Sequence, residues 1–216
     1  MSQMREMMNP SIINGIYAIT PDWHDTKKLV AKTDEILSNK INLLQYRNKK
    51  ANKQLKMTQA KELQALCRRY QVPFIINDDY ELCSILKADG IHLGKDDITI
   101  EEVRDKLGKK TIVGISCYND VERVNEMMRT SCDYIALGAC FPTKTKPNAP
   151  HASLNFLEHV VETSIKPVVA IGGINLDNCS PVINSGVDAI AMINALYSTD
   201  KVSDKILEIK RKFRND

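Results

Sequence analysis

The sequence predicts a single-domain α/β protein with the TIM (β/α)8 barrel fold. Eight short apolar segments recur along the chain, and each is followed by a segment with helical spacing. Most of the eight are apolar almost throughout, which is typical of parallel strands covered on both faces. An eightfold alternation with no Pro-, Gly- or Ser-rich linker closes most economically as a barrel. The alternative is a doubly wound open sheet, which usually has fewer strands and would leave one or two segments unexplained.

We expect the strands at residues 15–20, 41–47, 73–78, 90–94, 111–117, 134–140, 167–173 and 189–195. Between them, apolar residues repeat at three- and four-residue intervals, most clearly over residues 55–70 and 202–213, which predicts amphipathic helices. Thr99, followed three residues later by Glu102, has the pattern of a capping box at a helix start. We predict a short N-terminal lead at residues 1–14 and the barrel domain over residues 15–216.

Composition narrows the class of protein but names no function. The 30 basic and 27 acidic residues leave a formal net charge of +3, too balanced to argue for a nucleic-acid or membrane partner. No apolar run reaches the length of a membrane span, and the first residues lack the apolar stretch of a secretion signal. The six cysteines form no CxxC pair, which favours reduced structural thiols over a disulfide framework. We therefore expect a cytoplasmic protein.

The active site of such a barrel lies at the carboxyl ends of its strands. At the end of the second strand, Gln45, Arg47 and Lys49 alternate with Tyr46 and Asn48 and should share one face. Burying two cations and an amide on the inner face of the barrel would cost free energy unless an anion binds there. The alternative is that the strand ends early and that both cations extend into solvent.

Carboxylates follow the third and fourth strands, in Asn77-Asp78-Asp79 and in Lys95-Asp96-Asp97. Mg²⁺ binds through one or two carboxylates and completes its octahedron with water and phosphate oxygens. The alternative for Asp79 or Asp97 alone is that it caps the next helix. Because both carboxylate pairs fall at strand ends beside a cationic cluster, a magnesium–polyphosphate site accounts for them better than two separate caps.

The remaining strand ends add hydroxyl, lysine and glycine residues. Ser116 ends the fifth strand, and a proline-bounded loop at 141–150 carries Thr143, Thr145 and Lys146, which suits either a lid or an ordinary surface turn. Gly172-Gly173 and Ile193-Asn194 end the last two strands, the usual position of a backbone phosphate site. The sequence thus predicts one cationic, metal-bearing anion pocket and one neutral backbone cradle. Such a site suits joining a pyrophosphate-bearing substrate to a monophosphate. His92, within a strand, is interpreted as a structural histidine or as one that supports residues of the site.

The ordered motifs YAIT, LLQYRNK, PFIINDDYELCSILKADGIHLGKDD, VGIS, YIALGACFPTKTKP and VVAIGGI, over about residues 15–200, resemble the thiamine phosphate synthase family. The resemblance implies a TIM barrel that joins hydroxymethylpyrimidine pyrophosphate to thiazole phosphate. Pyrophosphate would leave first, and the thiazole nitrogen would capture the pyrimidine cation. It implies Mg²⁺ on Asp78 and Asp97, and pyrophosphate on Arg47, Lys49, Ser116 and Lys146. Gln45 and Asn77 would lie around the pyrimidine. The thiazole phosphate would be surrounded by Thr143, Thr145, Gly173, Ile193 and Asn194.

The chain departs from the family pattern at three places. Lys95 stands where the family usually has Gln, Asn194 stands where it has Ser, and a glycine common in the family is replaced within residues 150–153. Two other functions stay open: a related barrel that acts as a thiazole tautomerase, and a phosphate-ligand binding protein without turnover. The tautomerase needs no full magnesium–pyrophosphate set, which this sequence retains. The oligomeric state, monomer or homo-oligomer, also stays open.

Overall fold

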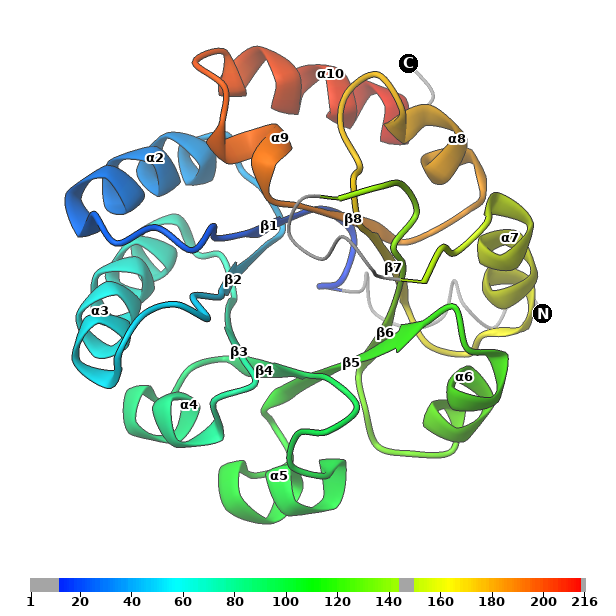
Figure 1. Cartoon of the computed structure of the whole chain (residues 1–216), viewed down its shortest axis with the longest axis horizontal. Helices are drawn as coiled ribbons and strands as arrows, with labels where there is room; N and C mark the ends of the chain where they lie inside the picture. Colours follow the sequence, from blue (N-terminus) through cyan, green and yellow to red (C-terminus); the bar gives the residue numbers. More distant parts are fainter. Residues whose placement is uncertain (1–11, 144–149, 215–216) are drawn as a thin grey trace.

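The computed structural model describes residues 12–143 and 150–214. Eight parallel strands form a closed barrel in sequence order, and pairing of β1 with β8 completes the ring (Figure 1). The predicted TIM barrel is confirmed, and the open-sheet alternative is excluded because that sheet would have two unpaired edges. The strands are β1 (Gly15–Ile19), β2 (Leu43–Tyr46), β3 (Phe74–Asn77), β4 (Gly90–Leu93), β5 (Ile112–Tyr118), β6 (Tyr134–Leu137), β7 (Val168–Ile171) and β8 (Ala189–Met192).

The helices surround the barrel on its outside, as Figure 1 shows. Thr99 and Glu102 form the predicted capping box at the start of one of them. Two helices rather than one follow β8, because a four-residue turn of helix precedes the last long helix. The helices are α2 (Thr26–Ser38), α3 (Lys53–Tyr70), α4 (Tyr80–Leu86), α5 (Ile100–Leu107), α6 (Val121–Met128), α7 (Leu154–Thr163), α8 (Cys179–Asn184), α9 (Asn194–Tyr197) and α10 (Val202–Arg214).

The strands are buried on both faces, as their apolar composition predicts. Outward-facing side chains pack against the helices in one large cluster, and a smaller cluster that includes Tyr17, Tyr134 and Val169 fills the barrel interior. All six cysteines are buried and free, in agreement with reduced structural thiols. None of the described helices is long and apolar enough to cross a membrane.

The residue before each even-numbered strand links that strand to the preceding one through a hydrogen bond to its side-chain oxygen. In each case an Asn or Asp directly precedes the even-numbered strand and accepts a hydrogen bond from a backbone N–H at the start of the preceding strand. The pairs are Asn42 Oδ1 with Ile16 N at 3.2 Å, Asp89 Oδ2 with Phe74 N at 2.8 Å, Asp133 Oδ2 with Val113 N at 2.7 Å, and Asp188 Oδ2 with Val168 N at 2.7 Å. The barrel therefore consists of four similar two-strand units.

Asp89→Ala should lower the free energy of unfolding by about 1–2 kcal/mol, because the Phe74 N–H loses its acceptor. Asp89→Asn should retain most of the stability, since Asn42 accepts the corresponding hydrogen bond between β1 and β2. Urea unfolding of both variants and the unchanged protein measures the difference. Equal destabilisation by alanine and asparagine would show that the acceptor oxygen is not what stabilises this position.

Candidate active site

A cavity of about 570 Å³ opens at the carboxyl ends of the strands. Its walls come from strand ends and from the loops that follow them, because parallel strands present their carboxyl ends at one rim of the barrel. Most of the site residues proposed from the sequence line this single cavity: Gln45, Arg47, Asn77, Ser116, Thr143, Gly173, Ile193 and Asn194.

A second cavity of about 370 Å³ adjoins the first, and Asn77 lines both. Lys49 and Asp78 line this second cavity. The expectation that Lys49 shares the inner face with Gln45 and Arg47 is therefore wrong: β2 ends at Tyr46, so strand alternation no longer applies at residue 49. Thr145 and Lys146 lie outside the described residues.

Arg47 is fixed in the main cavity by an acidic partner from another loop. Its Nη1 donates to both carboxylate oxygens of Asp22, at 3.1 and 3.3 Å, and only 10% of its side chain is exposed. Asp22 also accepts from the backbone N–H of Lys49 at 2.8 Å, so it holds the segment after β2 in place. The solvent-exposed alternative does not apply to Arg47. A guanidinium held this way presents its remaining N–H groups without the entropy loss of ordering a free side chain.

Asp78 and Asp97 approach each other from the ends of β3 and β4. Asp78 has a φ of 61°, a left-handed conformation that Asp tolerates better than most residues, and its N–H donates to the His92 carbonyl at 2.9 Å. Its carboxylate pairs with Lys49 Nζ at 3.0 Å. Burial raises the pKa of Asp97, and the nearby Asp78 carboxylate raises it further, although the Gly94 N–H bond at 2.6 Å and Lys49 act in the opposite direction.

This carboxylate pair fits a hard divalent cation bound jointly with a phosphate-bearing ligand. Within residues 12–143 and 150–214, no three His, Cys, Asp or Glu side chains gather closely enough to hold a metal without other ligands. Mg²⁺ needs only one or two protein carboxylates, because water and phosphate oxygens complete its coordination. The two aspartates considered as helix caps differ: Asp79 caps α4 by accepting from Leu82 N, whereas Thr99, not Asp97, caps α5.

The glycine pair after β7 permits close contact with the loop after β6. Phe141 N donates to the Gly172 carbonyl at 3.0 Å, and a side chain at Gly173 would lie 2.6 Å from the Pro142 carbonyl oxygen. Gly173 also has a φ of 65°, which other residues rarely adopt. The glycines therefore bring Thr143 to the same cavity wall as Ile193, where α9 begins.

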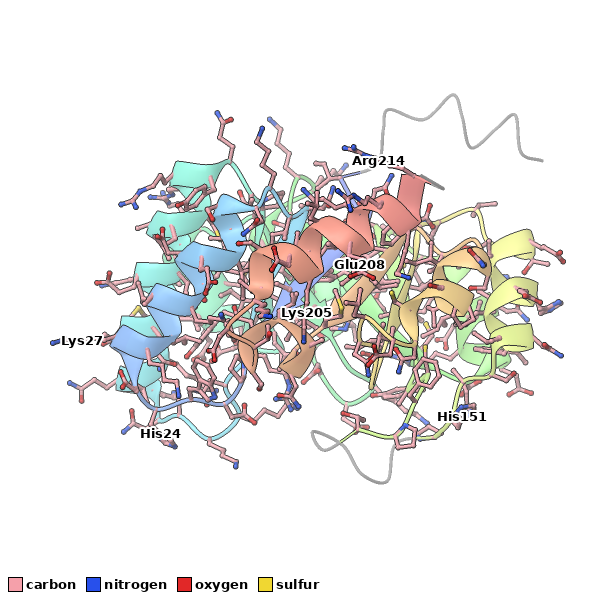
Figure 2. All side chains as sticks on the ribbon, turned by 90° about the horizontal axis from the view of Figure 1, so that it is seen from above. His24, Lys27, His151, Lys205, Glu208 and Arg214 are labelled. Atoms are coloured by element: carbon pink, nitrogen blue, oxygen red, sulfur yellow. The ribbon has the colours of Figure 1, made fainter. Side chains whose placement is uncertain are left out.

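Several side chains at the site carried no clear signal in the sequence. Asp22 lies in the loop after the first strand, and reading that strand end like the others would have identified it. His92, expected to be structural or to support site residues, has its Nε2 2.9 Å from Ser116 Oγ, and it also lines the cavity. His24 and His151 are exposed at one edge of the molecule, opposite Arg214 at the end of α10 (Figure 2), and neither lines the cavity.

Comparisons with known proteins agree with this geometry. The family described as thiamine monophosphate synthase matches residues 16–196. The chain belongs to the thiamine monophosphate synthase family. It is 43% identical over 201 residues to a thiamine-phosphate synthase of Methylobacillus flagellatus, covering 93% of this chain and 96% of that protein. A thiamine-phosphate synthase of Nitrosomonas eutropha is 39% identical, with 93% and 95% covered.

A solved member of the thiamine monophosphate synthase family has the same architecture. The thiamine phosphate pyrophosphorylase of Pyrococcus furiosus superimposes with a TM-score of 0.84 at 31% identity, and the match covers 96% of this chain and 98% of that one. The resemblance inferred from the ordered motifs is therefore confirmed at the level of family and fold.

Proposed function

We propose that this protein is a thiamine phosphate synthase, which condenses hydroxymethylpyrimidine pyrophosphate with thiazole phosphate to give thiamine phosphate and pyrophosphate. One observation supports the proposal most strongly. Most of the described residues assigned to the two substrates come from six different strand ends, yet they line two adjoining cavities at one rim of the barrel, and Asp97 contacts Asp78 beside them. Family membership supports the same reaction independently.

The pyrophosphate is assigned to the half of the rim that runs from β2 through β3 and β4 to β5. Arg47 and Ser116 line the cavity there. Lys49 lies beside this part of the cavity, paired with the carboxylate of Asp78. An arginine held by Asp22 supplies paired N–H donors for two phosphate oxygens. The side chain of Lys49 is 52% exposed, so it is accessible to a phosphate that competes with Asp78. The resemblance also assigns Lys146 to the pyrophosphate.

Asp78 and Asp97 are proposed to hold Mg²⁺. When bound there, Mg²⁺ would supply positive charge for the phosphate oxygens of the leaving group. The contact between the two carboxylates supports this assignment, because a cation between them would offset the repulsion that, after burial, raises the pKa of Asp97.

The organic parts of the substrates are assigned to the rest of the main cavity. Gln45 and Asn77 would orient the pyrimidine. Gly173, Ile193 and Asn194 line the opposite part, where backbone N–H groups at the start of α9 would bind the thiazole phosphate without adding charge. The resemblance assigns Thr143 and Thr145 to the same phosphate.

The reaction then needs no general base and no covalent nucleophile. The bond between the pyrimidine methylene carbon and its pyrophosphate oxygen breaks, and pyrophosphate leaves with the electron pair. The thiazole nitrogen donates its lone pair to the resulting cation and forms the new carbon–nitrogen bond. Arg47, Lys49 and Ser116 stabilise the charge that develops on the departing pyrophosphate. The apolar wall that includes Val169 and Ile171 limits the access of water to the cation.

The proposal is tested by incubating the purified full-length protein with both substrates, with and without Mg²⁺. Thiamine phosphate is measured after oxidation to its fluorescent thiochrome derivative, and pyrophosphate is measured in the same samples. We expect equal amounts of both products, formed only when Mg²⁺ and both substrates are present. Isomerisation of a thiazole without condensation would identify a tautomerase, and tight binding of both substrates without product would identify a binding protein. Either result would overturn the proposal.

A further inference from the structure

Five polar side chains form a continuous hydrogen-bonded chain across the barrel interior. They come from β2, β1, β6, β4 and β5, so the chain passes from one wall of the barrel to the other. Its four links are Gln45 Nε2 to Tyr17 OH at 2.9 Å, Tyr17 OH to Tyr134 OH at 2.8 Å, Tyr134 OH to His92 Nδ1 at 3.0 Å, and His92 Nε2 to Ser116 Oγ at 2.9 Å. The two ends, Gln45 and Ser116, are residues proposed to contact substrate.

The middle of this chain is buried and closely packed, although Tyr17 and His92 also border the main cavity. Tyr17 and Tyr134 are 1% and 0% exposed, and their rings meet edge to face with centroids 6.0 Å apart. The His92 ring stacks on Tyr134 at 5.6 Å. Gly114 makes room for this arrangement, because a side chain there would lie 1.9 Å from Cζ of Tyr134. Burial raises the pKa of both tyrosines, so both keep their hydroxyl protons.

The orientation of the Gln45 amide in the structure sets the direction of donation along the first three residues. Gln45 Nε2 carries only hydrogens, so Tyr17 oxygen accepts at this link. Among the described residues, Tyr134 is the other hydrogen-bond neighbour of that hydroxyl, so the proton of Tyr17 goes to Tyr134. Tyr134 in turn must donate its own proton to His92 Nδ1. Each residue thus accepts on one side and donates on the other.

The same assignment of protons extends from His92 to Ser116 at the cavity. A neutral imidazole that accepts at Nδ1 carries its proton on Nε2, so His92 donates to Ser116 Oγ. The hydroxyl proton of Ser116 is then not needed for any hydrogen bond within the chain. Ser116 can therefore donate it to a ligand in the cavity that this residue lines. At the other end, the Gln45 amide is oriented with Oε1 as its remaining acceptor, and Gln45 lines the same cavity.

We propose that Tyr17, Tyr134 and His92 are positioning residues, which hold Ser116 as a hydrogen-bond donor to an anionic leaving group and Gln45 as an acceptor for the pyrimidine amino group. This inference rests on the proposed function for the identity of the two ligands. The reversed chain, with the Gln45 amide turned over, would make Ser116 donate to His92 and would present only oxygen lone pairs to the pyrophosphate. An anion repels that arrangement, so a bound pyrophosphate selects the direction inferred here.

The tautomer of His92 distinguishes the two directions without any turnover. In ¹⁵N-labelled full-length protein at about pH 8, above the ordinary pKa of histidine, two-bond ¹H–¹⁵N correlation spectra report which ring nitrogen carries the proton. The His92 signals are assigned by their loss in His92→Gln. We expect the proton on Nε2, with and without Mg²⁺ and inorganic pyrophosphate. A proton on Nδ1, or on both nitrogens, would overturn the proposal.

Tyr134→Phe breaks the chain while keeping the buried ring. We expect the Kd for inorganic pyrophosphate with Mg²⁺, measured by calorimetry, to rise about five- to tenfold, because Ser116 is no longer held as a donor. We also expect the loss in condensation to fall mainly on kcat. Tyr70→Phe is the matched control: its hydroxyl bonds Asp34 on the outside of the barrel, and it lines neither cavity. Its Kd should stay within about twofold of the unchanged protein.

Tyr17→Phe is a second variant in case Tyr134→Phe folds poorly. It frees the Gln45 amide, so KM for the pyrimidine substrate should rise while the Kd for pyrophosphate changes less. Folded Tyr134→Phe and Tyr17→Phe proteins that both match Tyr70→Phe in Kd and in KM would overturn the proposal. If the unchanged protein makes no thiamine phosphate, the proposed function fails, whereas the tautomer and the pyrophosphate Kd still test the chain.

Discussion

Asp78→Asn should lower kcat/KM about 10²-fold or more and raise the Mg²⁺ concentration needed for half-maximal activity. The substitution removes one of the two carboxylates that adjoin at the ends of β3 and β4. It also removes the carboxylate that pairs with Lys49 Nζ at 3.0 Å. Asn tolerates the left-handed backbone at this position, with its φ of 61°, so the effect should come from the lost charge and not from a change in fold.

Asp79→Asn is the matched control for this prediction. It removes the same charge from the adjacent residue, and Asn can still cap α4 as Asp79 does. The ion pair of Asp79 with Lys56 spans 3.8 Å and is partly exposed, so its loss should have little effect. Steady-state assays across a range of Mg²⁺ concentrations compare the two variants. Similar activities for both would contradict the assignment of Asp78 to the metal.

Arg47→Ala should lower kcat about 10²- to 10³-fold, because it removes a preorganised cation from the pyrophosphate side of the cavity. It also leaves Asp22 without its guanidinium partner next to the bound anion, which adds repulsion. Asp22→Asn should have a smaller effect, of about tenfold, because Arg47 keeps its charge and loses only part of its orientation.

Lys50→Ala is the control for Arg47→Ala. Lys50 is exposed three residues further along the chain, and its removal lowers the net charge by the same amount. Calorimetry with inorganic pyrophosphate and Mg²⁺, together with kcat and KM for condensation, measures all three variants. A kcat for Arg47→Ala close to that of Lys50→Ala would contradict the role of Arg47 in stabilising the leaving group.

The barrel could be predicted from sequence because its eight strands are apolar on both faces and each has its own helical partner. The strand starts were placed within about two residues, but several ends were placed too late. Gly138, Gly172 and Gly173 extend apolar segments that read as strand, whereas their backbones turn to let the loops after β6 and β7 meet. Apolar composition alone does not distinguish a buried strand from a buried turn.

The candidate site could be predicted where a polar residue ends a strand, as at Arg47, Asp78 and Ser116. It could not be predicted where the role depends on contacts between distant strands. Tyr17 and Tyr134 lie 117 residues apart in sequence and occur in otherwise apolar segments, so only the closed barrel reveals that their hydroxyls meet. Lys49 was assigned to the wrong face because sequence alternation says nothing about where β2 ends.

The most direct test of the central claim is a crystal structure of the protein with Mn²⁺, pyrophosphate and thiamine phosphate, with the metal located by its anomalous scattering. We expect one Mn²⁺ peak between the carboxylates of Asp78 and Asp97, with pyrophosphate in contact with Arg47 and Ser116. We also expect the phosphate of thiamine phosphate beside Gly173 and Asn194. A metal held elsewhere would show that Asp78 and Asp97 are not its ligands, and a pyrophosphate bound away from Arg47 would show that Arg47 does not bind the leaving group.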